Sequence, residues 1–312
     1  MAENIHVKLP DGSVKDVPRG TSALDIAKGI SPRLADAALA AQIKPLASNG
    51  NGSGGNGHKP AAEAASPAAE PTKNNACLLY TSFAISSEES RYTLNGGLMV
   101  LKAESITMVA TDGHRLAHIE KQGEHFDVSG ENKTLIPKKA MSEIYSLLQN
   151  SDATEIEFAK DESTLFFRIG ERLLTSRQLT GQFPNYEAVL PRETTKSVTV
   201  HGADLNTAIQ RVAQFADERS RAIRMKLDKN ELKISSSSTD AGESEDSIET
   251  AYTADAMTIG FNSEYLLDFL KASNGGEVRL EFKDAQSAGQ MRPDDANDDG
   301  FKYRYVVMPM RI

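Results

Sequence analysis

The chain has 312 residues and a formal net charge of −9. This length leaves room for two or three domains, and the acidic charge means that any contact with nucleic acid must come from a local basic face. A single cysteine, Cys77, excludes an intrachain disulfide framework and is typical of a reducing compartment. No apolar run reaches transmembrane length and no signal-peptide core opens the sequence, so we expect a cytoplasmic protein without a membrane partner.

Residues 1–46 have the pattern of a partial, ubiquitin-like β-grasp module. Alternating apolar residues predict two strands around the turn Pro10-Asp11-Gly12, and Ser31-Pro32 predicts the start of a later helix. The string LPDGSVKDVPRGTSALDIAKGISPRLADAALAAQI resembles the TGS domain of threonyl-tRNA synthetases over residues 3–46. The resemblance implies an accessory, non-catalytic module that lacks the family's later strands.

Residues 47–75 contain no Val, Ile, Leu, Met or aromatic residue. Such a segment cannot bury enough apolar area to offset its ordering entropy, so we expect a disordered linker that continues through the junction to residue 82. Gly52, Gly54 and Gly57 fit the pattern G-x-G-x-x-G, but no strand precedes them and no helix follows. The pattern therefore does not predict a dinucleotide site.

The rest of the chain contains an internal repeat. Residues 91–112 and 221–240 each predict two strands around a tight turn, and the first strand of each pair is led by an arginine. Residues 135–158 and 257–282 each predict a strand, a helix and a strand. Because most segments alternate apolar and polar residues, we expect an α+β fold in which antiparallel sheets carry helices on one face.

Only the second copy opens with a predicted strand, KSVTVHG, followed by an apolar helix face formed by Leu205, Ala208, Ile209 and Val212. The first copy starts abruptly at Phe83, where such a helix should already be ending. We therefore expect part of its sheet to lack cover and to expose apolar area.

Three patterns resemble metal-binding or catalytic motifs, but each lacks a feature that the chemistry requires. His114 and His118 are four residues apart at the start of a predicted strand, which separates their side chains by about 13 Å, too far to share a metal ion. The stretch from Asp295 to Gly300 begins like a calcium loop, but Val306 stands where the bidentate glutamate belongs. Cys77 has no histidine nearby in the sequence to activate it. We predict a protein without catalytic residues, metal or cofactor.

Several ordered motifs carry a second resemblance. RYTLNG, ATDGHRLA, LIPKKAM, FPNYEAVLP, IGFNSEYLLDFL and YVVMPMRI resemble the bacterial sliding clamp, the beta subunit of DNA polymerase III, over residues 83–312. The resemblance implies a truncated clamp middle domain at 83–195 and a C-terminal domain at 196–312. Two chains of the family, each with three copies of one α+β domain, close into a homodimeric ring around DNA, and this chain lacks the first copy.

The resemblance also implies partners and site residues. The partners would be duplex DNA, contacted without regard to sequence, and peptides of the polymerase III alpha subunit, the clamp loader and other clamp-binding proteins. An apolar, Met-rich C-terminus is unusual for a chain end and suits a groove that accepts several peptides. The predicted groove residues are Leu94, Thr111, Gly113, His114, Arg115, Leu116, Pro184, Val189, Val306, Val307, Met308, Pro309, Met310 and Arg311. The predicted DNA-facing residues are Arg91, Tyr92, Lys138, Lys139, Arg219 and Arg221, and Phe215 is the predicted subunit-interface residue.

Residues 77–82, CLLYTS, belong to neither neighbour and resemble translated sequencing adapter. Domain fusions normally join whole domains, so one hypothesis is a chimeric reading frame that joins two genes. The alternatives are a true fusion in which the TGS-like module tethers a clamp fragment, and a peptide-binding adaptor that does not encircle DNA.

Overall fold

The computed structural model describes residues 4–8, 14–18, 40–43, 80–122, 126, 128, 130–153, 155–239, 241–273, 276–294 and 301–311. The predicted N-terminal helices, residues 47–79 of the predicted linker and junction, which include Cys77, and the acidic stretch 295–300 lie outside these residues. Residues 80–82 are described and helical, and Thr81 is fully buried, so the prediction of disorder up to residue 82 is wrong at this end. The chain divides into two compact units: residues 1–74 with 142–178, and residues 75–141 with 179–312.

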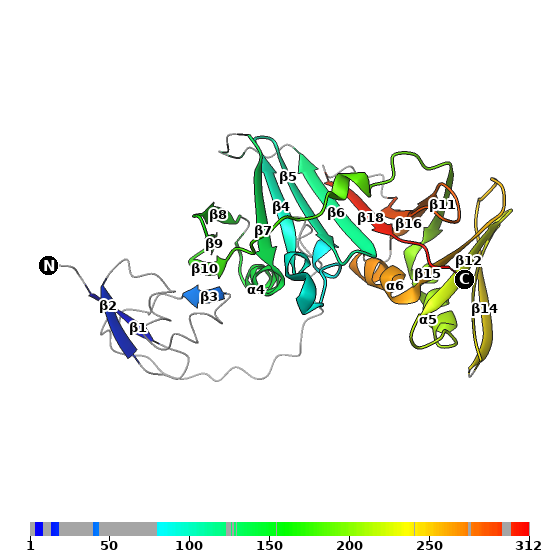
Figure 1. Ribbon diagram of the computed structural model, residues 1–312, viewed down its shortest axis with the longest axis horizontal. Coiled ribbons are helices and arrows are strands. Elements are labelled where there is room, and N and C mark those ends of the chain that lie inside the picture. Colours follow the sequence, from blue (N-terminus) through cyan, green and yellow to red (C-terminus); the bar gives the residue numbers. More distant parts are fainter. Residues whose placement is uncertain are drawn as a thin grey trace, which may run out of the picture. The chain divides into compact units, whose positions relative to one another are not determined.

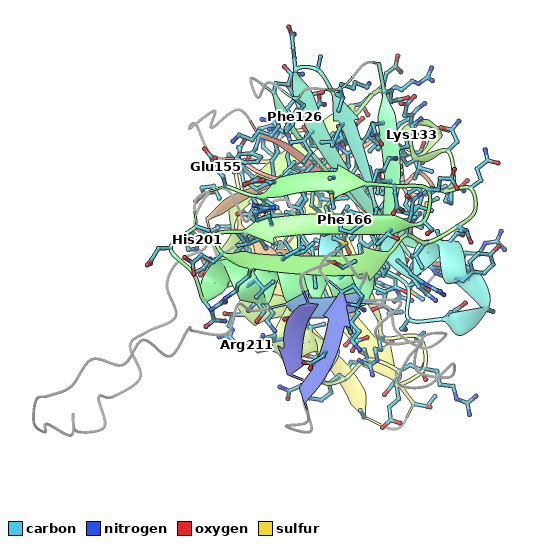
Figure 2. All side chains as sticks on the ribbon, turned by 90° about the vertical axis from the view of Figure 1, so that its left-hand side faces the viewer. Phe126, Lys133, Glu155, Phe166, His201 and Arg211 are labelled. Atoms are coloured by element: carbon cyan, nitrogen blue, oxygen red, sulfur yellow. The ribbon has the colours of Figure 1, made fainter. Side chains whose placement is uncertain are left out.

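The first unit begins with the predicted hairpin. Strand β1 (Asn4–Lys8) pairs antiparallel with β2 (Val14–Pro18), which confirms the two strands around the Pro-Asp-Gly turn. A second sheet has the order β3-β10-β9-β8, with β3 (Ala40–Ile43), β8 (Glu157–Lys160), β9 (Thr164–Ile169) and β10 (Arg172–Arg177). Strand β9 lies between β10 and β8, and it contains Phe166, which is labelled in Figure 2. The sheet therefore joins a strand from the N-terminal 46 residues to strands more than a hundred residues later in the sequence.

The second unit is built on an eight-stranded antiparallel sheet of order β11-β16-β17-β18-β6-β5-β4-β7. Its strands are β4 (Gly96–Lys102), β5 (Ser105–Thr111), β6 (Arg115–Gln122), β7 (Asn132–Pro137), β11 (Lys196–His201), β16 (Glu277–Phe282), β17 (Gly289–Pro293) and β18 (Phe301–Val307). A four-stranded sheet of order β14-β13-β12-β15 contains β12 (Ala222–Asp228), β13 (Glu231–Ser238), β14 (Gly242–Glu249) and β15 (Met257–Asn262).

Three α-helices accompany the sheets in the part of the chain that the structure describes beyond residue 100: α4 (Lys138–Gln149), α5 (Gly202–Ala213) and α6 (Ser263–Ala272). Two short 3-10 helices, η2 (Glu89–Leu94) and η3 (Tyr186–Ala188), lie in connecting segments. The helix α5 buries the predicted face of Leu205, Ala208, Ile209 and Val212. Its opening strand is β11, so the expected start of the second copy is confirmed.

The strand order confirms the internal repeat. The order β6-β5-β4-β7 is repeated as β14-β13-β12-β15, and each set is followed by a helix and three antiparallel strands, β8–β10 or β16–β18. The turn between β4 and β5 falls at residues 103–104, inside the segment 91–112, whose sequence predicts two strands around a tight turn. Every strand pairing among the described residues is antiparallel, in agreement with the predicted α+β class.

Two further expectations are wrong. The first strand of the repeat does not begin at Arg91 but at Gly96, because residues 89–94 form η2 and the backbone N–H of Ser86 closes this segment on the carbonyl of Leu94. The sheet of the first copy is also not left bare at β4, which is buried from Gly96 to Leu101. One reason is that Met141, at the start of α4, packs so closely that a Cβ at Gly97 would lie 2.8 Å from its sulfur.

Candidate functional site

The eight-stranded sheet brings together two motifs that are far apart in the sequence. Strands β6 and β18 lie side by side (Figure 1) and pair antiparallel, with Leu116 opposite Val306 and Arg115 opposite Val307. The pairing extends beyond the strands, because the backbone N–H of Met308 donates to the carbonyl of His114 over 2.9 Å. The TDGHRLA motif and the C-terminal YVVMPMRI motif therefore form one surface.

The turn between β5 and β6 is fixed by Asp112. Its Oδ1 accepts hydrogen bonds from the backbone N–H groups of His114 (2.9 Å) and Arg115 (3.1 Å). The hydroxyl of Thr111 accepts from Gly113 N–H at 3.1 Å and donates to the carbonyl of Arg115 at 2.6 Å. Gly113 has φ +93°, a conformation that other residues rarely adopt. The sequence Thr-Asp-Gly therefore specifies the local shape of the site.

Arg115 links this turn of the first copy to the helix α6 of the second copy. Its guanidinium donates to Asp112 (2.9 Å), to Asp268 on α6 (2.6 Å) and to the carbonyl of Phe83 (2.9 Å), and it lies 4.5 Å from the ring centroid of Tyr265. Burial alone would lower the pKa of Arg115, but Tyr305, Asp268 and Asp112 together raise it above its ordinary value. The side chain is only 10% exposed, and its ion pairs with Asp112 and Asp268 keep the guanidinium charged.

An apolar cluster forms the floor of the site. Buried side chains of β4, β5, β6, β7 and β18 meet there, and the segment from Leu179 to Leu190 packs against them. The cluster consists of Leu98, Val100, Val109, Leu116, Leu135 and Val306, with Leu179, Phe183, Tyr186, Val189, Leu190 and Ala288 partly buried against it. The FPNYEAVLP motif therefore belongs to a segment, residues 179–190, that covers this part of the eight-stranded sheet and is called the lid segment below.

A pocket of about 100 Å³ opens above this floor. It is lined by ten of the predicted groove residues and by Tyr186: Leu94, Thr111, Gly113, His114, Arg115, Leu116, Pro184, Tyr186, Val189, Val306 and Met308. Sequence reasoning missed Tyr186, although it lies inside the FPNYEAVLP motif. The lining is almost entirely apolar, and Met308 is 43% exposed at its edge.

The other four predicted groove residues do not line this pocket. Val307 is buried, and as the strand neighbour of Val306 its side chain points to the opposite face of the sheet. Pro309 and Met310 are half-buried, and the N–H of Met310 donates to the carbonyl of Gly260 at 2.8 Å. Arg311 is exposed. This part of the tail anchors the chain to β15 at Gly260.

The six predicted DNA-facing residues are all exposed and lie on three separate segments: η2, the first turn of α4, and the connection from α5 to β12. Those residues are Arg91, Tyr92, Lys138, Lys139, Arg219 and Arg221. Arg91 forms an ion pair with Glu88 at 3.3 Å, and Arg221 forms one with Glu264. Phe215, the predicted interface residue, is half-buried directly after α5. Their roles stay predictions.

His118 lies on β6 next to the pocket wall, while His114 lies in the turn. His118 is 8% exposed, its ring lies 5.8 Å from that of Tyr186, and its Nδ1 has no hydrogen-bond partner among the described residues. Burial lowers the pKa of His118, so it packs as a neutral ring. Within the described ranges, no three His, Cys, Asp or Glu side chains come together as a metal site requires. None of the helices in the same ranges is both long and apolar enough to cross a membrane.

Comparison with known families gives three matches along the chain. Residues 187–311 match the family described as DNA polymerase III beta subunit, C-terminal domain, and residues 73–185 match its central domain. Residues 5–45 match the TGS domain.

Similar proteins agree with these matches. The beta sliding clamp of Pseudomonas aeruginosa is 34% identical over 232 residues, which cover 74% of this chain and 62% of the relative. That of Proteus mirabilis is 34% identical over 236 residues, with coverage of 74% and 62%. The chain thus spans less than two thirds of the length of these relatives. A crystal structure of the DNA polymerase III beta subunit from Pseudomonas aeruginosa has a TM-score of 0.71 at 33% identity, covering 77% of this chain and 64% of that one. A clamp from the same organism bound to griselimycin has a TM-score of 0.70 at 32% identity, covering 81% and 68%.

Proposed function

Because this chain belongs to the DNA polymerase III beta subunit family, we propose that it serves DNA replication as a non-catalytic sliding-clamp fragment. It would hold DNA polymerase III on duplex DNA and bind partner peptides, including those of the alpha subunit and the clamp loader. The observation that carries this proposal is the apolar pocket bounded by the TDGHRL turn, the lid segment and Met308.

The chemistry of the pocket suits the capture of a short peptide. Its walls are apolar, its floor is a packed cluster, and its rim is held by the hydrogen bond from Met308 to His114. An apolar pocket with few polar groups gains affinity by removing large aliphatic or aromatic anchors from water. A flexible methionine at the edge lets one pocket accept anchors of different shape. We therefore assign leucine- and phenylalanine-type anchors to this pocket.

Griselimycin, which is bound to clamps of Pseudomonas aeruginosa and Bartonella birtlesii in solved structures, provides a direct probe. We expect calorimetric titration of the full chain to show saturable binding that Met308→Ala weakens about tenfold, the size of a moderate hot-spot contact. Ile156→Ala is the matched control, because Ile156 is also a large exposed apolar residue (37%) and does not line the pocket. Equal affinity of both variants, or no binding by the unaltered chain, would contradict the assignment.

Retention on DNA tests the clamp part of the proposal separately. A ring that encircles DNA stays on closed circular DNA at high salt and slides off after linearisation, because its hold is topological and phosphate contacts alone are screened. We expect salt-resistant retention on circles only. If griselimycin binds but circles are not retained, the adaptor that does not encircle DNA becomes the better description. The apolar pocket lies on the chain by itself and needs no encircled DNA to bind a peptide, and this observation favours the second candidate.

The division of the chain is part of the same proposal. We assign residues 1–46 to a partial TGS module, 47–82 to a linker and junction, 83–195 to the clamp middle domain and 196–312 to the C-terminal domain. Amplification of one long molecule across codons 60–100 from source DNA tests whether these parts belong to one gene. A contiguous product supports a true fusion, and its absence supports the chimeric reading frame.

A further inference from the structure

The two copies of the internal repeat are joined by strand pairing, because the last strand of one copy pairs with a strand of the copy before it. Strand β18 closes the second copy's run β16-β17-β18, and its outer side pairs antiparallel with β6 of the first copy over residues 301–307. Strand β10 holds the same place in the first copy's run β8-β9-β10. This arrangement therefore predicts that the outer side of β10 receives an antiparallel strand from whatever precedes it.

In this structure that place is filled. Strand β3 pairs antiparallel with β10, with Ala40 opposite Ser176 and Ile43 opposite Leu173. The position in the sheet and the polarity are those that β6 has on β18. β3 comes from the residues that match the TGS domain, yet among the described strands it does not join the β1–β2 hairpin.

The backbone explains why β10 needs a partner. An unpaired edge strand presents a row of N–H and C=O groups that any extended chain can join. β10 also lies in a packed part of the first unit, since Leu174 and Ser176 are 1% and 2% exposed. β3 pairs with four of its six residues, Leu173–Ser176. Closing a long loop costs only slightly more than closing a short one, so the long connection after residue 43 does not oppose the pairing.

We propose that the outer edge of β10 is a strand-acceptor site and that its occupant is this chain's own segment Ala40–Ile43. This segment replaces the strand that a preceding copy of the repeat would supply. Residues 40–43 are then held in register on β10. The edge is closed to a strand from a second copy of the chain. This inference does not depend on peptide or DNA binding.

Disulfide trapping in the full chain tests the register. In a Cys77→Ser background, Ala41→Cys is combined with Thr175→Cys, its cross-strand partner. The control combines Ala41→Cys with Ala159→Cys on β8, the far edge of the same sheet. Because a disulfide requires neighbouring Cα atoms, we expect an intramolecular bond to form at least about tenfold faster in the first pair, at a rate independent of protein concentration. Similar rates for both pairs, or only intermolecular bonds, would overturn the proposal.

Hydrogen exchange gives a second readout. A proline in β3 removes a backbone N–H and disrupts strand pairing, so Ala41→Pro should speed exchange in the peptide 172–177 while β18 stays protected. Ala47→Pro, which lies outside β3, is the control and should leave β10 unchanged. If Ala41→Pro leaves β10 exchange at the level of the control, β3 does not close this edge.

Discussion

Strands β6 and β14 occupy the same position in the two copies of the repeat but have opposite surroundings. β6 lies between β5 and β18, and Leu116, Ala117 and Ile119 are buried. β14 pairs with β13 only among the described strands and alternates between half-buried and exposed residues. The hairpin that builds each strand is the same, so the neighbour on the outer side decides how deeply the strand is buried.

The sequences of the two strands match their surroundings. β6 reads RLAHIEKQ and contains a run of apolar residues at its buried end, whereas β14 reads GESEDSIE and carries four acidic side chains. Charged residues on an outer strand disfavour uncontrolled addition of further strands. The comparison therefore predicts that substitutions in β6 lower the free energy of unfolding strongly, whereas substitutions at the matched positions of β14 lower it little.

The largest effect is expected at Ile119, which is fully buried opposite Met108. Ile119→Ala should lower the free energy of unfolding by about 3 kcal/mol, because it removes buried methyl groups and leaves a cavity. The matched position in the second copy is Asp246, opposite Ile234 and ion-paired to the exposed Arg211. Asp246→Ala should cost less than about 1 kcal/mol. Urea unfolding of both variants checks this, and equal costs would contradict the comparison.

Arg115→Ala should have the next largest effect. It leaves Asp112, whose side chain is 16% exposed, without its ion-pair partner and frees the carbonyl of Phe83. Breaking a buried pair costs about 3 kcal/mol or more, and the 42% exposure of Asp268 should reduce this to about 2 kcal/mol. The exposed Arg224 on β12 provides a control, since Arg224→Ala should change stability little. A cost no greater than that of Arg224→Ala would show that Arg115 does not fasten the turn.

Two glycines with similar backbone angles allow the cost of backbone strain to be distinguished from the cost of a steric contact with the new Cβ. Gly113, in the turn before β6, has φ +93°, and Gly242, at the start of β14, has φ +89°. An alanine at either position should cost about 1 kcal/mol for its backbone conformation. At Gly113 the new Cβ would also lie 2.8 Å from Arg91 Nη1, while at Gly242 it meets nothing within 4 Å. Thermal unfolding should therefore show a larger loss of stability for Gly113→Ala than for Gly242→Ala. Only Gly113→Ala should weaken griselimycin binding.

The smallest effect concerns pH. Burial lowers the pKa of His118 below its ordinary value of 6.5, so the unfolded chain takes up this proton before the folded chain does. Stability should therefore fall as pH drops below 6.5, until the pKa of the folded state is passed. His118→Leu should lose this part of the pH dependence, and His201→Leu, at an exposed histidine of β11 (Figure 2), should keep it. Identical pH profiles for both variants would rule out His118 as the source.

Much of this architecture could be predicted from local patterns. The β1–β2 hairpin, the tight turn between β4 and β5 and the repeated strand–helix–strand plan are encoded by residues close in sequence, and the structure confirms them. The position of Val307 could also have been predicted, since adjacent residues on a strand face opposite ways. The segment 89–94 was misread because its apolar residues do not distinguish a short 3-10 helix from a strand.

Two features depend on contacts that no local pattern encodes. The support that Arg115 gives to the pocket requires Asp268, which is 153 residues away in the sequence. The pairing of Ala40–Ile43 with β10 depends on which strand edge is left open elsewhere in the fold, and four apolar or amide residues do not specify that edge. Tyr186 was missed as a pocket residue for a similar reason, because the path of its segment over the sheet is set by the cluster beneath it.

The pairing of β3 with β10 also bears on the order of events during synthesis. The ribosome completes Ala40–Ile43 long before Arg172–Arg177, so the early strand must wait for its partner to emerge. Contacts between residues so distant in the chain form slowly, and a waiting strand is open to association with other chains. Expression conditions that slow translation should therefore extend this waiting period and increase the fraction of nascent chains that aggregate.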